Sequence, residues 1–217
     1  MKTTSQVLSA TELFVRNHLE GSEPGHDWSH VQRVYNTAML LSARLEADTF
    51  VVALASLLHD VGDAKFHDGD ETIGPELIKS FLLSQEIEES VFKEVMYIIE
   101  NMSFRKSSYF QNEKSLEFKI VQDADRLDSI GAIGIARAFS FGGYKRRPFH
   151  VPGLVYDEDN KSVTYQSGKS PTIYHFYEKL LLIKDMMNTA PAREMAEQRH
   201  QYMLDFLEQF YKEWEGI

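Results

Sequence analysis

Apolar residues recur every three to four positions along most of the chain, and this spacing is typical of amphipathic helices. Asp48 or Thr49 is the expected cap of a helix with almost no polar face, which should therefore be central and buried. Ser170 followed by Pro171 is typical of the start of a later helix. The full pattern predicts helices over residues 4–20, 29–47, 49–60, 72–83, 86–101, 114–122, 125–140, 171–187 and 191–214.

Strand signals are scarce, so the sequence predicts an all-α fold. We expect one domain over residues 1–217, with a core over about 20–140 and C-terminal helices over 171–215 that pack on the same domain. The exception is the stretch 141–170, rich in Gly, Pro and charged residues, where SVTYQS (162–167) predicts a short strand or hairpin. So long an irregular loop is uncommon in a compact domain and is usually functional.

Composition and charge narrow the function. The 217 residues carry a formal charge of −10 and a pI near 5.3, so a nucleic acid polymer or an anionic membrane is not an expected partner. The absence of cysteine excludes disulfides, thiolate zinc sites and a cysteine nucleophile. The N-terminal segment has no apolar signal core, and no run approaches about 18 apolar residues, so we expect a soluble, cytoplasmic protein. The sequence leaves the oligomeric state open and is compatible with a homo-oligomer.

Ionisable residues gather where the apolar third helix ends, in the stretch LLHDVGDAKFHDGDE. His59 and Asp60 are adjacent, and Asp63 comes one turn after His59, so the three side chains are expected near one helix end. Another histidine, His30, stands at the start of the second helix. Burying the His59-Asp60 pair alone would be costly, so the pair either has an internal partner or holds a cation.

Three acids, Asp123, Asp125 and Asp128, are expected around the start of a further helix in VQDADRLDSIG. One interpretation is a capping cluster in a first helical turn, with Arg126 pairing one of the acids. The other interpretation is a metal site, in which an acid of this segment lies close to His30, His59 and Asp60. Imidazole and carboxylate together suit an octahedral site for a divalent ion such as Mn, Fe, Co, Ni or Mg. The residues alone leave both interpretations open.

The ordered set of His30, His59-Asp60 and Asp125 resembles the HD-domain phosphohydrolase superfamily. The segments DWSHVQRV, LLHDVGDAKF, DADRLDSIGAIGIARAF and HFYEKLLLIKDMMNTAPAREMA are similar to bacterial stand-alone HD hydrolases, a subgroup with nucleotide pyrophosphatase-like members. The resemblance implies an HD-domain helical bundle in which these four residues bind a divalent metal ion, with Asp128 as the reserve for the last ligand.

Other branches of the superfamily, the binuclear phosphodiesterases and the HD-type oxygenases, add histidine ligands between the HD pair and the last Asp. Here the only histidine in 61–124 is His67, which comes too soon to match those positions, so one metal ion is favoured. The resemblance also implies that Asp63 handles the proton of an attacking water and that Asp68 is a second such acid. Lys65 is expected to meet a phosphate oxygen, unless it is a surface lysine.

Basic residues outside the motif are candidates for holding a substrate. Because Arg can bind phosphate with two hydrogen bonds, GGYKRRPFH predicts a phosphate clamp, for which a solvated turn is the alternative. Its aromatic residues could stack a base or anchor the loop. A later pair is expected near the site by family resemblance. The candidates are Lys145, Arg146 and Arg147 with Tyr144 and Phe149, and then His175 with Lys179.

Together these features predict a metal-dependent phosphohydrolase that cleaves a phosphoanhydride or phosphoester of a nucleotide or related small phosphate compound through a metal-activated water. One alternative is a non-catalytic sensor that binds metal or nucleotide, but neither a ligand nor the neighbouring acid has been lost from this sequence. The other alternative, an HD-type oxygenase, is disfavoured by the missing histidines.

Overall fold

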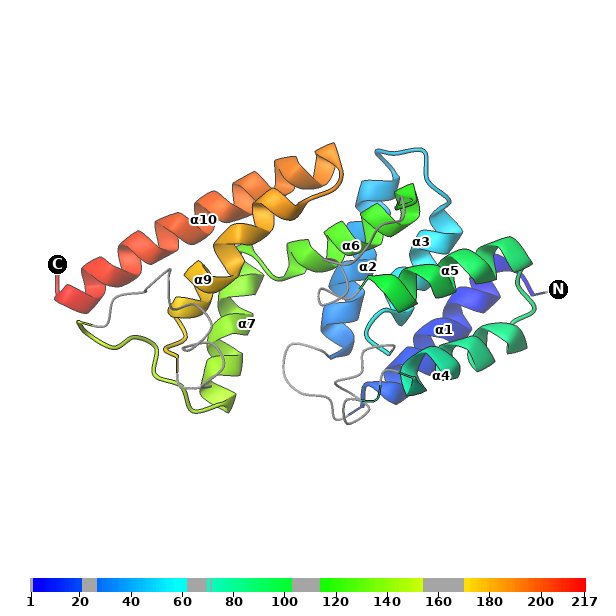
Figure 1. Ribbon diagram of the computed structural model, residues 1–217, viewed down its shortest axis with the longest axis horizontal. Helices are drawn as coiled ribbons and strands as arrows, with labels where there is room; N and C mark the ends of the chain where they lie inside the picture. The colour runs from blue at the N-terminus through cyan, green and yellow to red at the C-terminus, as the bar shows by residue number, and fades with distance from the viewer. Residues whose placement is uncertain (1, 21–26, 62–69, 71, 103–113, 154–169) are drawn as a thin grey trace. The chain divides into compact units, whose positions relative to one another are not determined.

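The computed structural model describes residues 2–20, 27–61, 70, 72–102, 114–153 and 170–217, and within them every regular element is a helix. The prediction of an all-α fold is therefore confirmed, whereas the hairpin predicted at 162–167 lies outside the described residues. The chain divides into two compact units, residues 1–125 and 126–217 (Figure 1). None of the described helices is both long and apolar enough to cross a membrane.

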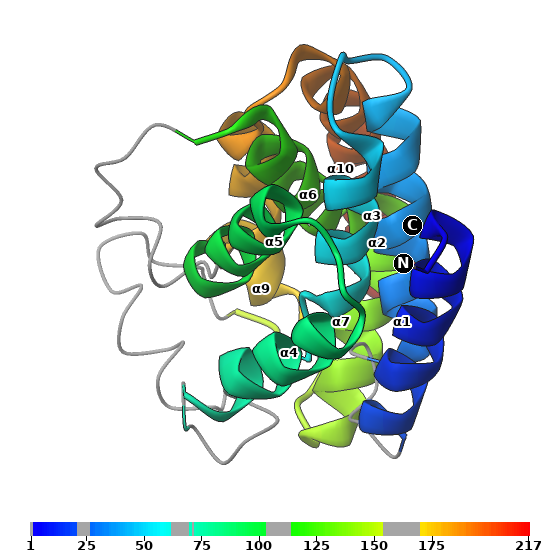
Figure 2. The same cartoon turned by 90° about the vertical axis from the view of Figure 1, so that its right-hand side faces the viewer.

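The first unit is built around α3 (Thr49–Leu58), which packs against three other helices of the unit and lies between α2 and α5 (Figure 2). Every residue from Val51 to Leu58 is buried, as expected for a helix without a polar face. The other helices of this unit are α1 (Thr4–His18), α2 (Trp28–Ser42), α4 (Ile73–Ser84), α5 (Glu89–Asn101) and α6 (Leu116–Asp128) as far as residue 125.

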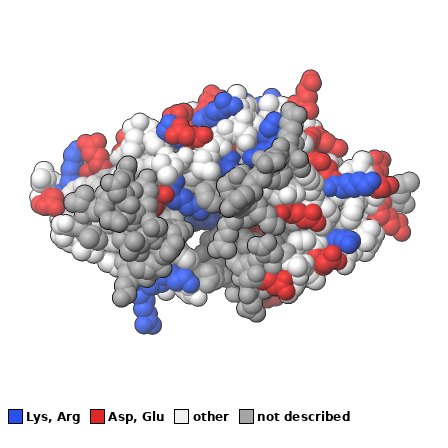
Figure 3. All heavy atoms as spheres, viewed as in Figure 1, with Lys and Arg blue, Asp and Glu red and all other residues white. Residues whose placement is uncertain are grey.

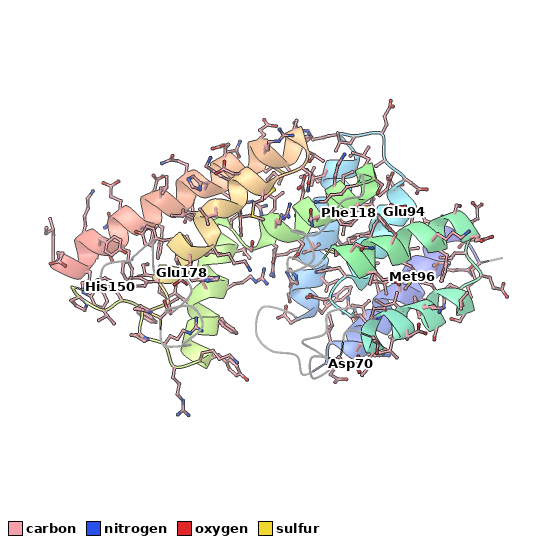
Figure 4. All side chains as sticks on the ribbon, in the orientation of Figure 1. Asp70, Glu94, Met96, Phe118, His150 and Glu178 are labelled. Carbon is pink, nitrogen blue, oxygen red and sulfur yellow. The ribbon has the colours of Figure 1, made fainter. Side chains whose placement is uncertain are left out.

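Hydrogen bonds at the helix starts fix α6 against α3 and α5. The Asp48 carboxylate caps α3 by accepting from the Phe50 N–H at 2.9 Å, and the Asp48 N–H donates to Glu117 of α6 at 2.8 Å. Beside it, the Ser115 hydroxyl donates to Glu94 of α5 at 2.5 Å (Figure 4 labels Glu94). The first turn of α6 is thus held to both neighbours.

The predicted break between residues 122 and 125 was wrong, because α6 is one helix from Leu116 to Asp128. Its apolar spacing continues through the acids, because Ile120, Ala124 and Leu127 are buried at positions i, i+4 and i+7 of one helix. Asp123, Asp125 and Asp128 therefore lie in the last turns of α6, not at a helix start. The helix dipole does not favour acids there, so their carboxylates need other partners.

The second unit contains α7 (Gly131–Tyr144), α9 (Tyr174–Glu178), the 3-10 helix η3 (Leu180–Met186) and α10 (Ala190–Glu215). The helix predicted over 171–187 is in fact the short α9 followed by η3, which differs from the expected single α-helix. α10 packs against both α7 and η3. Phe139, Phe176 and Phe206 meet inside the unit, with ring centroids 5.9 to 6.1 Å apart.

Candidate metal centre

Three buried side chains of the first unit converge on one point. His30 lies in the first turn of α2, where its backbone N–H donates to the carboxylate of the capping Asp27. His59 and Asp60 follow the last residue of α3. The His30 Nε2 lies 3.2 Å from the His59 Nε2 and 3.4 Å from the Asp60 Oδ2. The His59 Nε2 lies 3.7 Å from the Asp60 Oδ1. The ends of two helices thus bring these three groups together.

Asp125 adds a fourth donor from α6. Its Oδ1 lies 3.5 Å from the His30 Nε2 and 3.9 Å from the His59 Nε2. The Asp125 side chain is 41% exposed, whereas the His30 side chain is fully buried. The cluster therefore sits at the edge of the core, with its Asp125 side accessible to small molecules.

The imidazole of His59 is held in one tautomer. Its Nδ1 lies 2.8 Å from the carbonyl oxygen of Ser56, and a carbonyl can only accept, so this nitrogen carries the proton. The Nε2 of the neutral ring then keeps its lone pair on the side of His30 and Asp60. Such a backbone contact commonly orients metal-binding histidines. Sequence reasoning missed the role of Ser56, because a carbonyl leaves no residue signature.

The spacing of the four residues fits a divalent ion. Around an octahedral ion with ligands at about 2.1 Å, neighbouring ligands are about 3.0 Å apart and opposite ligands about 4.2 Å apart. The five distances above, from 3.2 to 3.9 Å, fall inside this range. Two imidazoles and two carboxylates also suit Mn, Fe, Co or Ni, and with less preference Mg. His30, His59, Asp60 and Asp125 are the residues that would hold it.

Asp128, the alternative last ligand, has a different environment. Its carboxylate accepts from Arg137 of α7 at 2.8 Å, and its backbone carbonyl accepts from the same guanidinium at 3.2 Å. Arg199 of α10 donates to the carbonyl of Leu127 beside it. Two arginines thus hold the C-terminal end of α6, an arrangement that favours Asp125 over Asp128 as the ligand.

The predicted catalytic residues Asp63, Lys65 and Asp68 lie outside the described residues, as does His67. Their roles stay predictions.

A second cluster lies within the second unit and contains Arg147, His175 and Lys179. Burial, then Lys179 and Arg147, lower the pKa of His175 to about 4, so its ring is neutral at physiological pH. Burial also raises the pKa of Glu178, although a hydrogen bond from Ser170 at 3.4 Å and the charge of Arg147 oppose the shift (Figure 4). The structure thus unites three of the predicted substrate residues and adds Glu178, which sequence reasoning missed.

The other residues of the predicted clamp are arranged differently. The ammonium of Lys145 lies 4.6 Å from the Tyr144 ring centroid and 5.3 Å from that of Phe141. Arg146 is exposed, and Figure 3 shows basic side chains projecting at the C-terminal end of α7. Phe149 packs edge-on against Phe139 at 5.2 Å, so at least part of its role is to anchor the loop.

Comparison with known proteins identifies the class. Residues 27–130 match the HD domain, and the chain is 42% identical over 205 residues to YpgQ of Bacillus subtilis, covering 94% of this chain and 92% of YpgQ. This protein belongs to the HD-domain family.

Solved structures agree with this assignment. An HD-superfamily hydrolase from Bacillus thuringiensis superposes with a TM-score of 0.81 at 40% identity, covering 99% of this chain and 100% of that chain. Bacillus subtilis YpgQ in complex with ADP gives a TM-score of 0.75 at 36% identity, covering 100% of this chain and 99% of that chain. The family and these relatives support a metal-dependent hydrolase.

Proposed function

We propose that this protein is a metal-dependent phosphohydrolase acting on a nucleotide or a related small phosphate compound. The observation that carries the proposal is the convergence of His30, His59, Asp60 and Asp125, with donor atoms 3.2 to 3.9 Å apart and one accessible side. The ADP bound to the relative from Bacillus subtilis supports a nucleotide as the ligand. Cleavage of a phosphoanhydride in a nucleoside triphosphate is the first candidate reaction, and monoester hydrolysis of a nucleoside monophosphate is the second.

Different residues of the chain have different roles in the proposed reaction. A divalent ion held by the four ligands would supply Lewis acidity, which makes water nucleophilic near neutral pH and polarises a phosphoryl oxygen. Ser56 keeps the His59 ring in the tautomer whose Nε2 can bind a cation. We assign the acceptance of the water's proton to Asp63, with Asp68 as the second candidate, and phosphate neutralisation to Lys65.

The cluster of the second unit is proposed to bind substrate phosphates. Arg147 can donate two parallel hydrogen bonds to a phosphate, and Lys179 adds a point charge. His175, kept neutral by burial and by these two cations, has one ring N–H to donate without adding charge. Glu178 lies close enough to Arg147 for their charges to interact, so it can orient that guanidinium.

The proposal is tested with metal-depleted protein that receives Mn, Co, Ni, Fe or Mg in turn and is then mixed with nucleoside mono-, di- and triphosphates. Release of phosphate or pyrophosphate is measured. We expect turnover that requires a divalent ion and falls at least 100-fold in His59→Ala, because one of four ligands is lost. Glu89→Ala, which removes only an exposed carboxylate paired with Lys93, is the matched control and should retain full activity.

Two results would count against the proposal. If the metal-loaded protein hydrolyses none of these nucleotides and His59→Ala behaves like the parent, the assignment fails. Tight binding of nucleotide and metal without turnover would instead favour the sensor.

A further inference from the structure

The turn that ends α7 has the hydrogen bonds of a Schellman motif. The Arg147 N–H donates to the carbonyl of Gly142 at 2.8 Å, and the Arg146 N–H donates to that of Gly143 at 3.0 Å. This motif places one residue in the left-handed region, and here that residue is Arg146, with a φ of 55°. Glycine is the usual choice, because a Cβ atom is strained in this conformation.

An arginine in the place of glycine lowers stability, so its side chain needs another reason to be there. Strained residues persist where the side chain or the conformation is used. The structure gives the Arg146 side chain no ion pair or hydrogen bond with any residue that it describes, and this side chain is exposed. Contacts with the described residues therefore do not explain the arginine.

The charge of the surroundings points to an anion. The first 125 residues contain 21 acidic and 11 basic residues, whereas residues 126–217 contain 12 of each. The excess of acid thus belongs to the first unit. Lys145, Arg146 and Arg147 are the only three consecutive basic residues in the chain, and they lie in the neutral unit. Such a turn attracts anions although the whole protein is acidic.

Neighbouring arginines in this turn have different surroundings. Arg147 is half-buried, helps to keep His175 neutral by lowering its pKa, and interacts with the charge of Glu178, in the cluster proposed to bind phosphate. Arg146, one residue earlier on a turn fixed by two backbone hydrogen bonds, is exposed beside it. The Arg147 cluster alone can bind one phosphate group. A longer phosphate chain carries additional negative charges, which Arg146 and Lys145 can bind.

We propose that Arg146 is a specificity-determining residue that binds the phosphate chain of a nucleoside polyphosphate and makes affinity increase with the number of phosphates. This inference rests on the proposed function and deepens it. The ligand contacted is a phosphate oxygen, bound through a charge-assisted hydrogen bond. Loss of that contact should raise the KM for a triphosphate about tenfold and leave kcat within about twofold, because a contact that is equally strong in the ground state and in the transition state changes KM and not kcat.

The chain offers a matched control for the backbone strain. Glu86, which follows the end of α4 in the first unit, also has a φ of 55°. Arg146→Gly and Glu86→Gly should each raise the melting temperature, by about 2 °C, because both relieve a left-handed residue. Arg146→Asn removes the charge but keeps a residue that tolerates this conformation. Only the two Arg146 variants should lose affinity for the triphosphate.

Parent and variants are compared for KM and kcat on the mono-, di- and triphosphates of the nucleoside preferred by the parent, and for equilibrium binding of a non-hydrolysable triphosphate analogue. If nothing is hydrolysed, binding of AMP, ADP and ATP is measured. We expect a loss that grows with phosphate number and shrinks at high salt. If Arg146→Gly and Arg146→Asn bind the triphosphate as tightly as the parent while His59→Ala is inactive, this inference is wrong and the proposed function stands. A parent that neither binds nor hydrolyses any nucleotide overturns the proposed function as well.

Discussion

The ion pair between Arg137 and Asp128 gives a prediction that separates the two candidate ligands on α6. The Asp128 side chain is 5% exposed and that of Arg137 is 20% exposed, so Arg137→Ala leaves this buried carboxylate without the guanidinium that it binds at 2.8 Å, although the charge of Arg199 still acts on it. Breaking a buried pair in this way costs about 3–5 kcal/mol, and the partial exposure of Arg137 places the cost near about 3 kcal/mol. For a chain of this size, that lowers the melting temperature by about 6–12 °C.

The assay pairs thermal unfolding with Mn²⁺ titration for Arg137→Ala, Asp128→Asn and Asp125→Asn. Asp125→Asn should lower Mn²⁺ affinity by about 10–100-fold. Its unfolding free energy should change by less than about 1 kcal/mol, because the Asp125 side chain is 41% exposed. Asp128→Asn should lower stability and leave Mn²⁺ affinity almost unchanged. The reasoning is refuted if Asp128→Asn loses Mn²⁺ affinity as Asp125→Asn does, or if Arg137→Ala melts with the parent.

Three further predictions concern stability. The pKa of His175 is lowered to about 4 in the folded protein, so its neutral ring costs no stability above about pH 6.5, and this stability is lost as the pH falls towards 4. Between these two pH values, the unfolding free energy of the parent, measured in urea, should fall by up to about 3 kcal/mol more than that of His175→Gln. The buried hydroxyl of Thr172 has no hydrogen-bond partner among the described residues, so Thr172→Val should raise the unfolding free energy by about 1 kcal/mol; a loss would reveal a partner. Mn²⁺ at about 100 times its dissociation constant should stabilise the parent by about 2.7 kcal/mol, and calorimetry should show no such shift in His59→Ala.

The hydrophobic pattern was sufficient to predict α1 to α5 of the first unit. The buried α3 follows from a run of apolar residues behind Asp48, and the structure confirms both the run and the cap. The prediction failed at α6, where the acids of VQDADRLDSIG were interpreted as a helix start. Buried Ile120, Ala124 and Leu127 keep the helical spacing across the acids, and this spacing should have outweighed the local preference of Asp for a first turn.

The sequence could not predict which residues of the second unit come together. It gave Lys145, Arg146 and Arg147 as one clamp, because they are consecutive. In the structure their surroundings differ in part: Lys145 and Arg147 both lie over the Phe141 ring, but only Arg147 acts on His175 and Glu178, and Arg146 is exposed. A turn that requires a left-handed residue is hard to recognise without glycine at that position.

The residues of the candidate metal centre are up to 95 positions apart in the chain, so the sequence alone gave a metal site as one of two interpretations and the family resemblance favoured it. Residue types alone left a paired His59 and Asp60 as plausible as a cation site. The geometry supplies what the sequence lacked: four side chains, from α2, the end of α3 and α6, that lie close together, and a backbone carbonyl that fixes the ring of His59.

The most direct test is a crystal structure of the protein grown with Mn²⁺ and measured at the manganese absorption edge. The account predicts one anomalous peak, within about 2.0–2.3 Å of the Nε2 atoms of His30 and His59 and of carboxylate oxygens of Asp60 and Asp125. A peak bound by other residues, or one bound by Asp128 in place of Asp125, would contradict the account.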